Sequence, residues 1–497
     1  MASPQSHQQS TPASRHWHIR ALEPGDIDAL HEASLYILEH VGIKVEDEEA
    51  AEFFARAGAQ VQRLPDHSRV RIPRAVVEAA IASAPSSFTL CGRNPENDFL
   101  VQRGGVPGFT AGYGEHVKVV DIHTGEVRPT GKQDLADITR IQDGLDVIKF
   151  AERAAVSGDR YAPVQAVHNF DAMVRNTSKH IFLSAGGRAN AKAIVAMAQA
   201  VAGGADQLRE RPILTMLVSP TSPLTLVTEC TSAIQVAIEA GLGVVFHAMS
   251  LSGASSPATP VGVVVQHNAE LLGALVFAQA ISRGARCIFA YNSTMMDLLR
   301  SVAPIGVPEL ALHGVAGIQL AQHYDIPTWA GGCASDSKIP DAQQAYDFSL
   351  TAMPAALAGA NIIYGIGALE SVITFDYAAM IMGAEQARRI LRLVQGIDMS
   401  GLDEAVKVIE EVGPGGEYVT HDHTFDHMRE LSSSSLFDRR SRELWERDGS
   451  RTATDRAYEE ARKILATHLP LPLGDGVEDQ LEAILAAREV EARAARD

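Results

Sequence analysis

Polar and aromatic side chains follow directly after short apolar runs at several places in this sequence. His247 comes after one run, Tyr291 after another, and Tyr364 and Glu370 after a third. A further run leads into segment 331–338, which reads Gly-Gly-Cys-Ala-Ser-Asp-Ser-Lys. Adjacent glycines allow a backbone to approach a ligand closely. We therefore expect the site to gather around segment 331–338, with the other runs supplying side chains.

Each of these side chains also has a purely structural interpretation. His247 at a strand end is more often a buried structural histidine than a catalyst. Glu370 either caps a helix or faces a cation. Ser335 and Asp336 are placed to cap the helix that follows them. Cys333 is discounted as a nucleophile, because no Cys–His pairing can be identified in the sequence.

A group of histidines near the C-terminus is a weak candidate for a metal site. His423 and His427 could share one helix face, and His421 and Asp422 lie beside them. Their spacing is not the His-Glu-x-x-His arrangement of zinc enzymes, and the cysteines lack a Cys-x-x-Cys pair. We therefore expect no metal in this protein.

The elements that must position these residues follow a strand–helix rhythm. Strands are predicted at 180–185, 213–218, 243–249, 286–291, 326–330 and 361–365, with a helical segment between each pair. Segment 226–238, for example, has apolar residues on one face and polar residues off it. Strand, helix and strand in regular succession are typical of βαβ units. The fold class is therefore α/β.

A closed (β/α)8 TIM-type barrel fits this pattern best. A seventh strand is predicted at 147–151 and an eighth on the C-terminal side of Leu393. No Gly-x-Gly-x-x-Gly follows the first strand, which disfavours an open dinucleotide-binding sheet. The repeating units share no motif, which excludes a repeat array. Because catalytic groups in such barrels lie in the loops after the strands, the candidate residues should meet at one end.

The barrel is predicted to occupy residues 146–420, between two attached regions. Residues 1–20 are polar and are predicted to be a disordered tail. Residues 21–145 are predicted to be helical, with a β-hairpin cap whose turn lies at Thr124 and Gly125. Residues 421–497 are predicted to form a C-terminal helical extension. Its last segment interleaves Glu and Arg, which is typical of a solvated helix.

The composition limits the partners and the compartment. Of the 497 residues, 46% are hydrophobic and 21% charged, so a large core is expected. The net charge of −18 disfavours nucleic acid and anionic membranes as partners. No run approaches the length of a membrane span, and the N-terminus lacks the pattern of a signal peptide. We expect a cytoplasmic protein without a disulfide scaffold, because only four cysteines are present.

Taken in order, the loop segments resemble those of the trimethylamine methyltransferase family, specifically its members without pyrrolysine. The most specific pieces are 294–297, 306–309, 332–338, 357–361 and 367–370. Shorter pieces at 121–126, 176–177, 256–257, 268–270, 415–416, 423–427, 438–439 and Trp445 continue the pattern. The resemblance extends from about residue 25 to about residue 470, which is nearly the whole chain.

The resemblance implies a barrel enzyme that demethylates a methylated amine and passes the methyl group to a corrinoid protein. Members without pyrrolysine look like demethylases of quaternary amines such as glycine betaine. The family's pyrrolysine position would fall in or near loop 331–338, with Cys333 as the candidate position. A quaternary amine leaves as a neutral tertiary amine without proton transfer, so no general acid is needed. Reduced Co(I) in a partner's corrinoid would be the nucleophile, so no catalytic side chain is expected.

A quaternary ammonium has no N–H to donate, so aromatic faces and carboxylates would bind it. The candidate aromatic walls are Tyr113, Phe246, Tyr291, Trp329, Tyr364 and Phe375. Glu309 and Glu370 are candidate counter-charges. Lys338, His247 and His423 are candidate donors to the carboxylate of a betaine. Gly331, Gly332, Cys333 and Asp336 would shape the loop beside the cation.

Two other functions remain open at this point. Tetrahydrofolate could accept the methyl group directly, or the barrel could catalyse an unrelated C–N lyase or hydrolase reaction. In either case turnover would not require a corrinoid. The chain could also bind a methylated amine without turning it over. We rank this reading last, because Gly-rich, polar loops are typical of catalytic barrels. We also expect a homo-oligomer.

Overall fold

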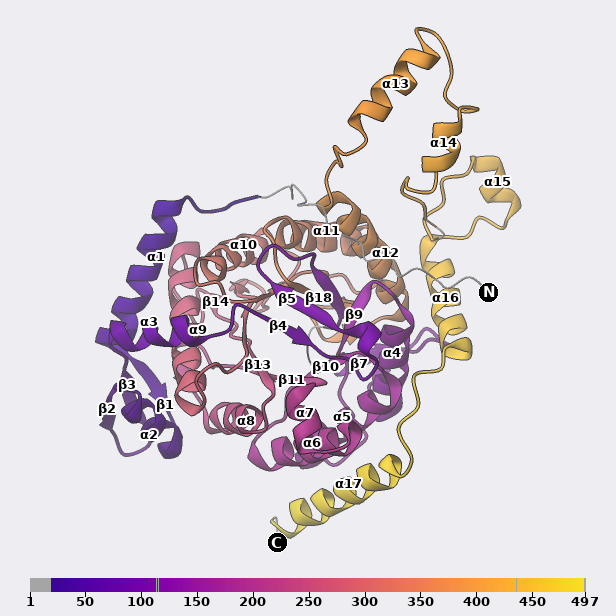
Figure 1. Ribbon diagram of the computed structural model, residues 1–497. Helices are drawn as coiled ribbons and strands as arrows, with labels where there is room; N and C mark the ends of the chain where they lie inside the picture. Colours follow the sequence, from indigo (N-terminus) through magenta and orange to yellow (C-terminus); the bar gives the residue numbers. More distant parts are fainter. Residues whose placement is uncertain (1–18, 113, 115, 435, 496–497) are drawn as a thin grey trace.

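Eight parallel strands close into a barrel in this computed structural model, which describes residues 19–495 apart from 113, 115 and 435. In barrel order the strands are β10 (His180–Leu183), β11 (Leu214–Val218), β13 (Gly243–Phe246), β15 (Cys287–Tyr291), β17 (Thr328–Gly331), β18 (Ile362–Ile366), β6 (Gly108–Ala111) and β9 (Ile148–Glu152). Helices surround the strands on all sides (Figure 1). The predicted (β/α)8 fold is confirmed.

The helices that cover the barrel alternate with its strands along the chain. They are α4 (Lys132–Gly144), α5 (Gln165–Asn176), α6 (Arg188–Ala202), α8 (Thr228–Glu239), α9 (Pro260–Ile281), α10 (Pro308–His323), α11 (Ala342–Leu357) and α12 (Tyr377–Val394). The short helix α7 (Ala205–Glu210) follows α6. Because helices cover the outside and side chains fill the inside, the strands are buried on both faces.

The eighth strand was predicted at the wrong end of the chain. Helix α12 runs to Val394 and is followed by α13 (Leu402–Val412), so no strand lies on the C-terminal side of Leu393 among the described residues. The missing strand is β6, which precedes all the others and pairs with β18 and β9. It has four residues, and a Cβ at Gly108 would lie 2.6 Å from the Phe150 ring. A short strand that begins with glycine carries little periodic signal.

Helix α9 is the one described helix whose length and composition would suit a membrane span. It has 22 residues, and 78% of its most apolar stretch is buried within the protein. It packs against α1 (Pro24–Tyr36), α2 (Glu48–Arg56) and α3 (Arg74–Ser83) as well as α10. These contacts identify α9 as a core helix, which explains its apolar composition.

The N-terminal region covers one side of the barrel and plugs its N-terminal end. A sheet of β1 (Ile43–Val45), β2 (Gln60–Arg63), β3 (Ser68–Arg71) and β12 (Thr225–Leu226) lies beside α2. The hairpin of β4 (Ser87–Leu90) and β5 (Phe99–Gln102) crosses the barrel end (Figure 1). Leu90 and Val101 join the hydrophobic cluster inside the barrel, and the Phe99 ring meets Phe150 edge-on at 5.0 Å. This end is therefore closed by packed side chains.

The predicted β-hairpin cap is confirmed at the opposite end. β7 (Lys118–Val120) and β8 (Val127–Pro129) are antiparallel, and Gly125 adopts a φ of 75° in the turn between them. They form one sheet with β19 (Ala368–Leu369) and β20 (Thr374–Phe375), which follow barrel strand β18. A second small sheet, β14 (Leu251–Ser252) and β16 (Thr294–Met295), joins the loops after β13 and β15. Both sheets therefore belong to the C-terminal end of the barrel.

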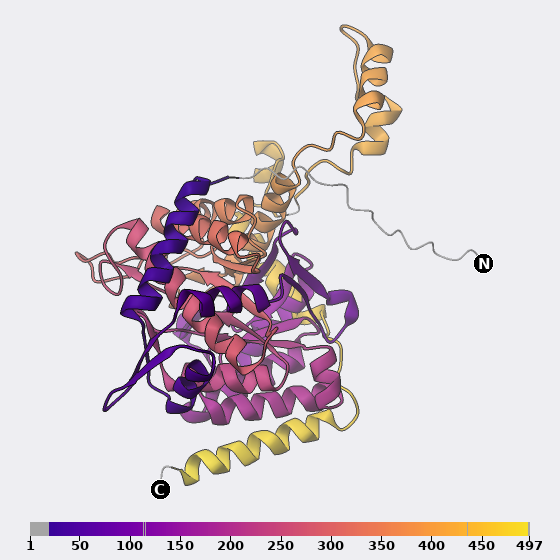
Figure 2. The same cartoon turned by 60° about the vertical axis from the view of Figure 1, so that its left-hand side comes forward.

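The C-terminal region has two parts. Helix α13, α14 (Asp422–His427) and α15 (Arg442–Arg447) form an arm that projects from the barrel (Figures 1 and 2). Helix α16 (Ala453–Thr467) then returns to pack against α12 and α4. Helix α17 (Val477–Ala494) lies along α6 and buries Leu481 completely. The last helix, which the sequence predicted to be solvated, is therefore packed along one face and exposed on the rest.

Candidate active site at the barrel mouth

Aromatic side chains fill the barrel below its C-terminal mouth. Phe150, Phe182, Trp329 and Tyr364 come from four strands and are all fully buried. The ring of Phe182 meets Trp329 edge-on at 4.4 Å, although β10 and β17 lie on opposite sides of the barrel. Trp329 in turn meets Tyr364 edge-on at 5.4 Å. These rings form the floor on which anything bound at the mouth would rest.

His247 and Tyr364 meet directly across the interior. His247 Nε2 and the Tyr364 hydroxyl share a hydrogen bond of 2.8 Å. Their strands, β13 and β18, are separated in the barrel by β15 and β17. The bond can form only because both side chains point inward from the strand ends. Burial lowers the pKa of His247 to about 4, so the imidazole is neutral at neutral pH.

Glu152 brings a carboxyl group to the mouth. It ends β9 two residues after Phe150, which belongs to the interior cluster, so strand alternation turns its side chain inward. Its exposure is 1%, and its Oε2 atom has no hydrogen-bond partner among the described residues. Burial raises the pKa of Glu152 well above its ordinary value, although Arg153 opposes the shift. A cation bound here would restore the carboxylate form.

Two further buried side chains at this end have polar atoms without partners in the described part of the chain. Asn292 lies just beyond β15 and follows Ile288 and Ala290 at a spacing of two residues, so its side chain points inward as theirs do. Both its Oδ1 and Nδ2 atoms lack a partner. The Nε1 atom of Trp329 is also unpartnered. Buried polar groups in native proteins nearly always have a hydrogen-bond partner, so these atoms require a ligand or water.

Two basic side chains follow neighbouring strands at this end of the barrel, Arg153 after β9 and His116 after β6. Arg153 is buried next to Glu152, and its Nη2 atom donates to the Ser184 hydroxyl at 3.3 Å. His116, in the loop after β6, is buried and its Nδ1 atom donates to the Ala154 carbonyl at 2.5 Å. Burial lowers the pKa of His116 to about 4, which leaves its Nε2 atom as an acceptor. The mouth therefore offers both acceptors and donors.

Phe246 and Tyr291 do not face this site, contrary to the prediction. Both belong to the cluster between the barrel and its helices. Tyr291 stacks on His267 of α9 at 5.2 Å, and a Cβ at Gly317 of α10 would lie 2.0 Å from its ring. Phe246 packs near Phe289 on the same outer face, at 6.3 Å between ring centroids. Phe375, in β20, lies in this outer cluster too.

Loop 331–338 has a structural role rather than a central place in the site. Asp336 accepts hydrogen bonds of 2.9 Å from the backbone N–H groups of Ile305 and Gly306, and one of 2.7 Å from the Ser371 hydroxyl. The cap of α11 is Asp341, which accepts from Gln344 N–H at 3.1 Å, so the predicted caps Ser335 and Asp336 are wrong. The loop therefore ties together the segments that follow β15, β17 and β18.

Cys333 and Lys338 of this loop lie outside the cluster inside the barrel, whereas Ala334 belongs to it. A Cβ at Gly332 would lie 3.0 Å from the Ala352 Cα in α11, so this glycine permits close helix packing. Cys333 is buried in the outer cluster at a φ of 60°, and burial raises the pKa of its thiol well above the ordinary value. Lys338 is exposed and donates to the Asp336 carbonyl at 2.7 Å. Gly331 alone lies within the barrel wall, opposite Tyr364.

The remaining candidates lie outside the group at the mouth. Glu370 accepts a 2.6 Å hydrogen bond from the Thr374 hydroxyl, and Lys118 Nζ lies 3.7 Å from the same oxygen, so its charge is already matched. Glu309 lies in the first turn of α10, in the outer ring of helices. His423 lies on the projecting arm. Tyr113 falls outside the described residues.

The structure therefore brings together His247, Trp329 and Tyr364 of the predicted set. It adds Glu152 and Asn292, whose positions along their strands turn them inward, with Arg153 next to Glu152 in the chain. A signal for the acid was present in the sequence. Glu152 and Arg153 directly follow the apolar run 147–151, as catalytic residues of barrels follow their strands. Chemically, this arrangement can hold a small molecule that carries both a cationic and an anionic group.

Comparison with known proteins gives one consistent answer. A family model described as trimethylamine methyltransferase (MTTB) matches residues 1–493. A trimethylamine methyltransferase of Desulfitobacterium hafniense is 43% identical over 471 residues, which cover 95% of this chain and 94% of that protein. A glycine betaine methyltransferase of the same species is 32% identical over 476 residues, covering 94% and 96%. The crystal structure of the Methanosarcina barkeri monomethylamine methyltransferase covers 92% of this chain and 97% of that chain, with a TM-score of 0.51 and 12% identity, and supports the barrel fold.

Proposed function

The chain belongs to the trimethylamine methyltransferase family, and from that premise we propose that it demethylates a quaternary amine, glycine betaine or a related betaine. The methyl group would pass to the corrinoid of a partner protein. Its 497 residues are all of standard types, so it is a member without pyrrolysine. The observation that carries the substrate proposal is that buried polar atoms of both kinds, acceptors and donors, have no hydrogen-bond partner at the mouth among the described residues. Glu152 offers an acceptor for a cation, and Asn292 and Trp329 offer N–H donors for a carboxylate.

The side chains at the mouth suit the cationic end of a betaine. A quaternary ammonium is bound by aromatic faces and by carboxylates, because it has no N–H to donate. The ring floor of Trp329 and Tyr364 supplies such faces, and the Glu152 carboxyl supplies the charge. Glu152 would ionise as the cation binds, because the neighbouring positive charge offsets the effect of burial. The open amide of Asn292 and the indole N–H of Trp329 would then orient the anionic end.

The chain's own task in the reaction would be to bind and orient the amine. A corrinoid supplies, when its cobalt is reduced to Co(I), the nucleophile that accepts a methyl group. The site would hold one methyl group toward the opening and exclude water, and a positioned reactant lowers the barrier without an acid or base from the protein. The neutral His247 imidazole is in keeping with this role, because the departing tertiary amine needs no proton.

The proposal extends to compartment and assembly. The four cysteines of the chain are all free and buried, which is typical of proteins in a reducing compartment, and we therefore place the enzyme in the cytoplasm. We also propose that it is a homo-oligomer.

A substrate panel tests the proposed function. Purified protein would be mixed with Co(I) cobalamin and with glycine betaine, proline betaine, carnitine, choline or trimethylamine, one at a time. We expect a betaine to be demethylated, seen as dimethylglycine by mass spectrometry for glycine betaine, together with loss of Co(I) absorbance. Product from trimethylamine alone would contradict the substrate proposal. Product formed with tetrahydrofolate and no corrinoid would contradict the acceptor, and calorimetric binding without any product would contradict turnover.

A further inference from the structure

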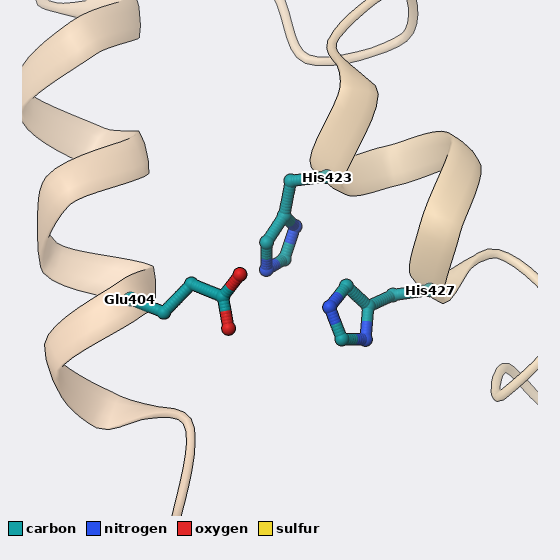
Figure 3. A group of neighbouring side chains, drawn as sticks. All are labelled: Glu404, His423 and His427. Carbon is teal, nitrogen blue, oxygen red and sulfur yellow. The ribbon is translucent and has the colours of Figure 1, made fainter.

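Two imidazoles and one carboxylate meet on the projecting arm, away from the barrel mouth. His423 and His427 are four residues apart on α14 and therefore share one face. Glu404, in the first turn of α13, faces them from the other helix (Figure 3). One ligand atom from each of the three residues lies within 4.8 Å of the other two. The sequence predicted no metal here, because the spacing of the histidines is not His-Glu-x-x-His, and Glu404 was not among the candidate ligands.

A fourth residue orients one of the imidazoles. His427 Nδ1 lies 3.0 Å from the Glu430 carboxylate. A hydrogen bond of this kind places the proton on Nδ1 and leaves Nε2 as the free lone pair. In Figure 3 a ring nitrogen of each histidine is turned toward the Glu404 carboxylate. Histidines that bind metals almost always have such a partner on the second nitrogen.

The donor set selects the kind of ion. Two imidazole nitrogens and one carboxylate oxygen are typical ligands of Zn²⁺ and of similar divalent transition metals, whereas Mg²⁺ and Ca²⁺ prefer oxygen ligands alone. Three protein ligands leave a coordination position for water. The side chain of His427 is 41% exposed, so an ion could reach the group from solvent.

Little hydrophobic burial holds α13 against α14, although one ion pair joins them, between His421 Nε2 and Glu411 Oε2 at 3.4 Å. Among the described residues, α13 buries only Val408, and α14 and α15 bury none. Large apolar side chains on the arm are exposed instead, with Ile409 at 58% and Phe425 at 74%. Helices as short as these are marginal without tertiary packing. A metal ion bound between the two helices would supply a cross-link that the hydrophobic core does not.

We propose that Glu404, His423 and His427 bind one Zn²⁺ or a similar divalent transition metal, which cross-links α13 to α14 and orders the arm. The site is separate from the methyl-transfer chemistry at the barrel mouth. Its test is therefore independent of the substrate.

Metal titration tests the binding step. Full-length protein without a polyhistidine tag would be dialysed against a chelator and titrated with Zn²⁺ in competition with a chromophoric chelator. We expect one tight site per chain, and an affinity at least about tenfold lower in His423→Asn, His427→Asn and Glu404→Gln. His67→Asn is the matched control, because His67 pairs only with Asp66 among the described ion pairs. An unchanged melting temperature of the barrel would show that each variant folds.

Limited proteolysis tests whether the metal cross-links α13 and α14. Cleavage within residues 402–431, mapped by mass spectrometry, should slow when Zn²⁺ is added to the parent protein and should not change for His423→Asn. Stoichiometric binding that survives all three substitutions would overturn the proposal. So would an absence of tight binding, or a cleavage rate in the arm that Zn²⁺ does not alter.

Discussion

The hydroxyl of Tyr364 and the imidazole Nε2 of His247 are joined by a 2.8 Å hydrogen bond that crosses two intervening strands of the barrel. The bond links the residue that follows β13 to a residue of β18, and the Tyr364 ring also meets Trp329 edge-on at 5.4 Å. Neither residue has to transfer a proton in the proposed reaction. The pair would instead define one wall of the site, and its loss should change how well the amine is positioned.

Tyr364→Phe should therefore lower kcat more than it weakens binding. The substitution keeps the ring on the floor but removes the hydroxyl, so His247 loses a partner inside the protein. Leaving a buried polar group unsatisfied costs about 1–3 kcal/mol, which should also lower the melting temperature. Single-turnover rates and calorimetric Kd values for the substrate that the panel identifies would separate the two effects. Equal kcat in variant and parent would show that the bond does not position the substrate.

Glu152→Gln should weaken binding of the cationic amine by about tenfold or more. Two unit charges about 4 Å apart attract by about 4 kcal/mol in a protein-like dielectric, and a factor of ten corresponds to about 1.4 kcal/mol. Glu370→Gln is the matched control, because its carboxylate already faces Lys118 and lies outside the mouth. Calorimetry would measure Kd for both variants. A weaker Kd in Glu370→Gln than in Glu152→Gln would restore the earlier candidate as the counter-charge.

Trp329→Phe should weaken amine binding, whereas Tyr291→Phe should leave it unchanged. Trp329 faces the interior, so losing its indole should weaken amine binding, since aromatic contact with a cation contributes about 0.5–2 kcal/mol. Tyr291 faces α9 and α10, and its hydroxyl has no partner among the described residues. Its removal should leave Kd unchanged and leave the melting temperature equal or higher. A changed Kd in Tyr291→Phe would contradict the outward orientation.

The contrast between these two aromatics shows what sequence could and could not predict. The alternation of strands and helices was sufficient to predict the barrel, and strand ends were sufficient to find His247 and Tyr364. Barrel strands are apolar on both faces, however, so the sequence pattern does not show which residues of a strand point into the barrel. Tyr291 and Phe246 lie beside inward-facing neighbours, and only the closed barrel shows which of two adjacent residues points inward. Glu152 is not among the predicted residues, because the apolar run 147–151 carries little periodic signal and its end does not stand out in the sequence.

Other features of the molecule depend on contacts between segments that are far apart in the sequence. Asp336 looked like a ligand group because it follows a strand and two glycines. Its carboxylate instead binds the backbone of residues 305 and 306, which are near neighbours only in the folded protein. The same limit applies to Glu404 and His427, which meet because α13 and α14 turn back on each other. Spacing along the chain contains neither relationship.

Cys333→Ala should leave methyl transfer within about twofold of the parent. The thiol is buried in the outer cluster, and its raised pKa keeps it protonated and unreactive at neutral pH. The positive φ at this position disfavours alanine and cysteine alike, so the backbone strain is unchanged. Turnover assays on the two proteins would measure the ratio, and thermal unfolding would report the small loss of buried volume. Loss of turnover without loss of fold would give Cys333 a chemical role.

The stability of Glu152→Gln relative to the parent should depend on pH, because burial raises the pKa of Glu152 above its ordinary 4.5. The folded parent holds a proton that the unfolded chain releases above that value. The resulting stabilisation is complete at pH values below 4.5 and is lost as the pH rises through the raised pKa. Glutamine does not titrate, while all other groups cancel in the comparison. The melting temperature of the variant should therefore rise relative to the parent between about pH 5 and about pH 8. Adding the bound amine should reduce this gain, because the cation favours the ionised carboxylate in the parent. A melting-temperature difference that stays constant over this range would contradict the raised pKa that burial gives Glu152.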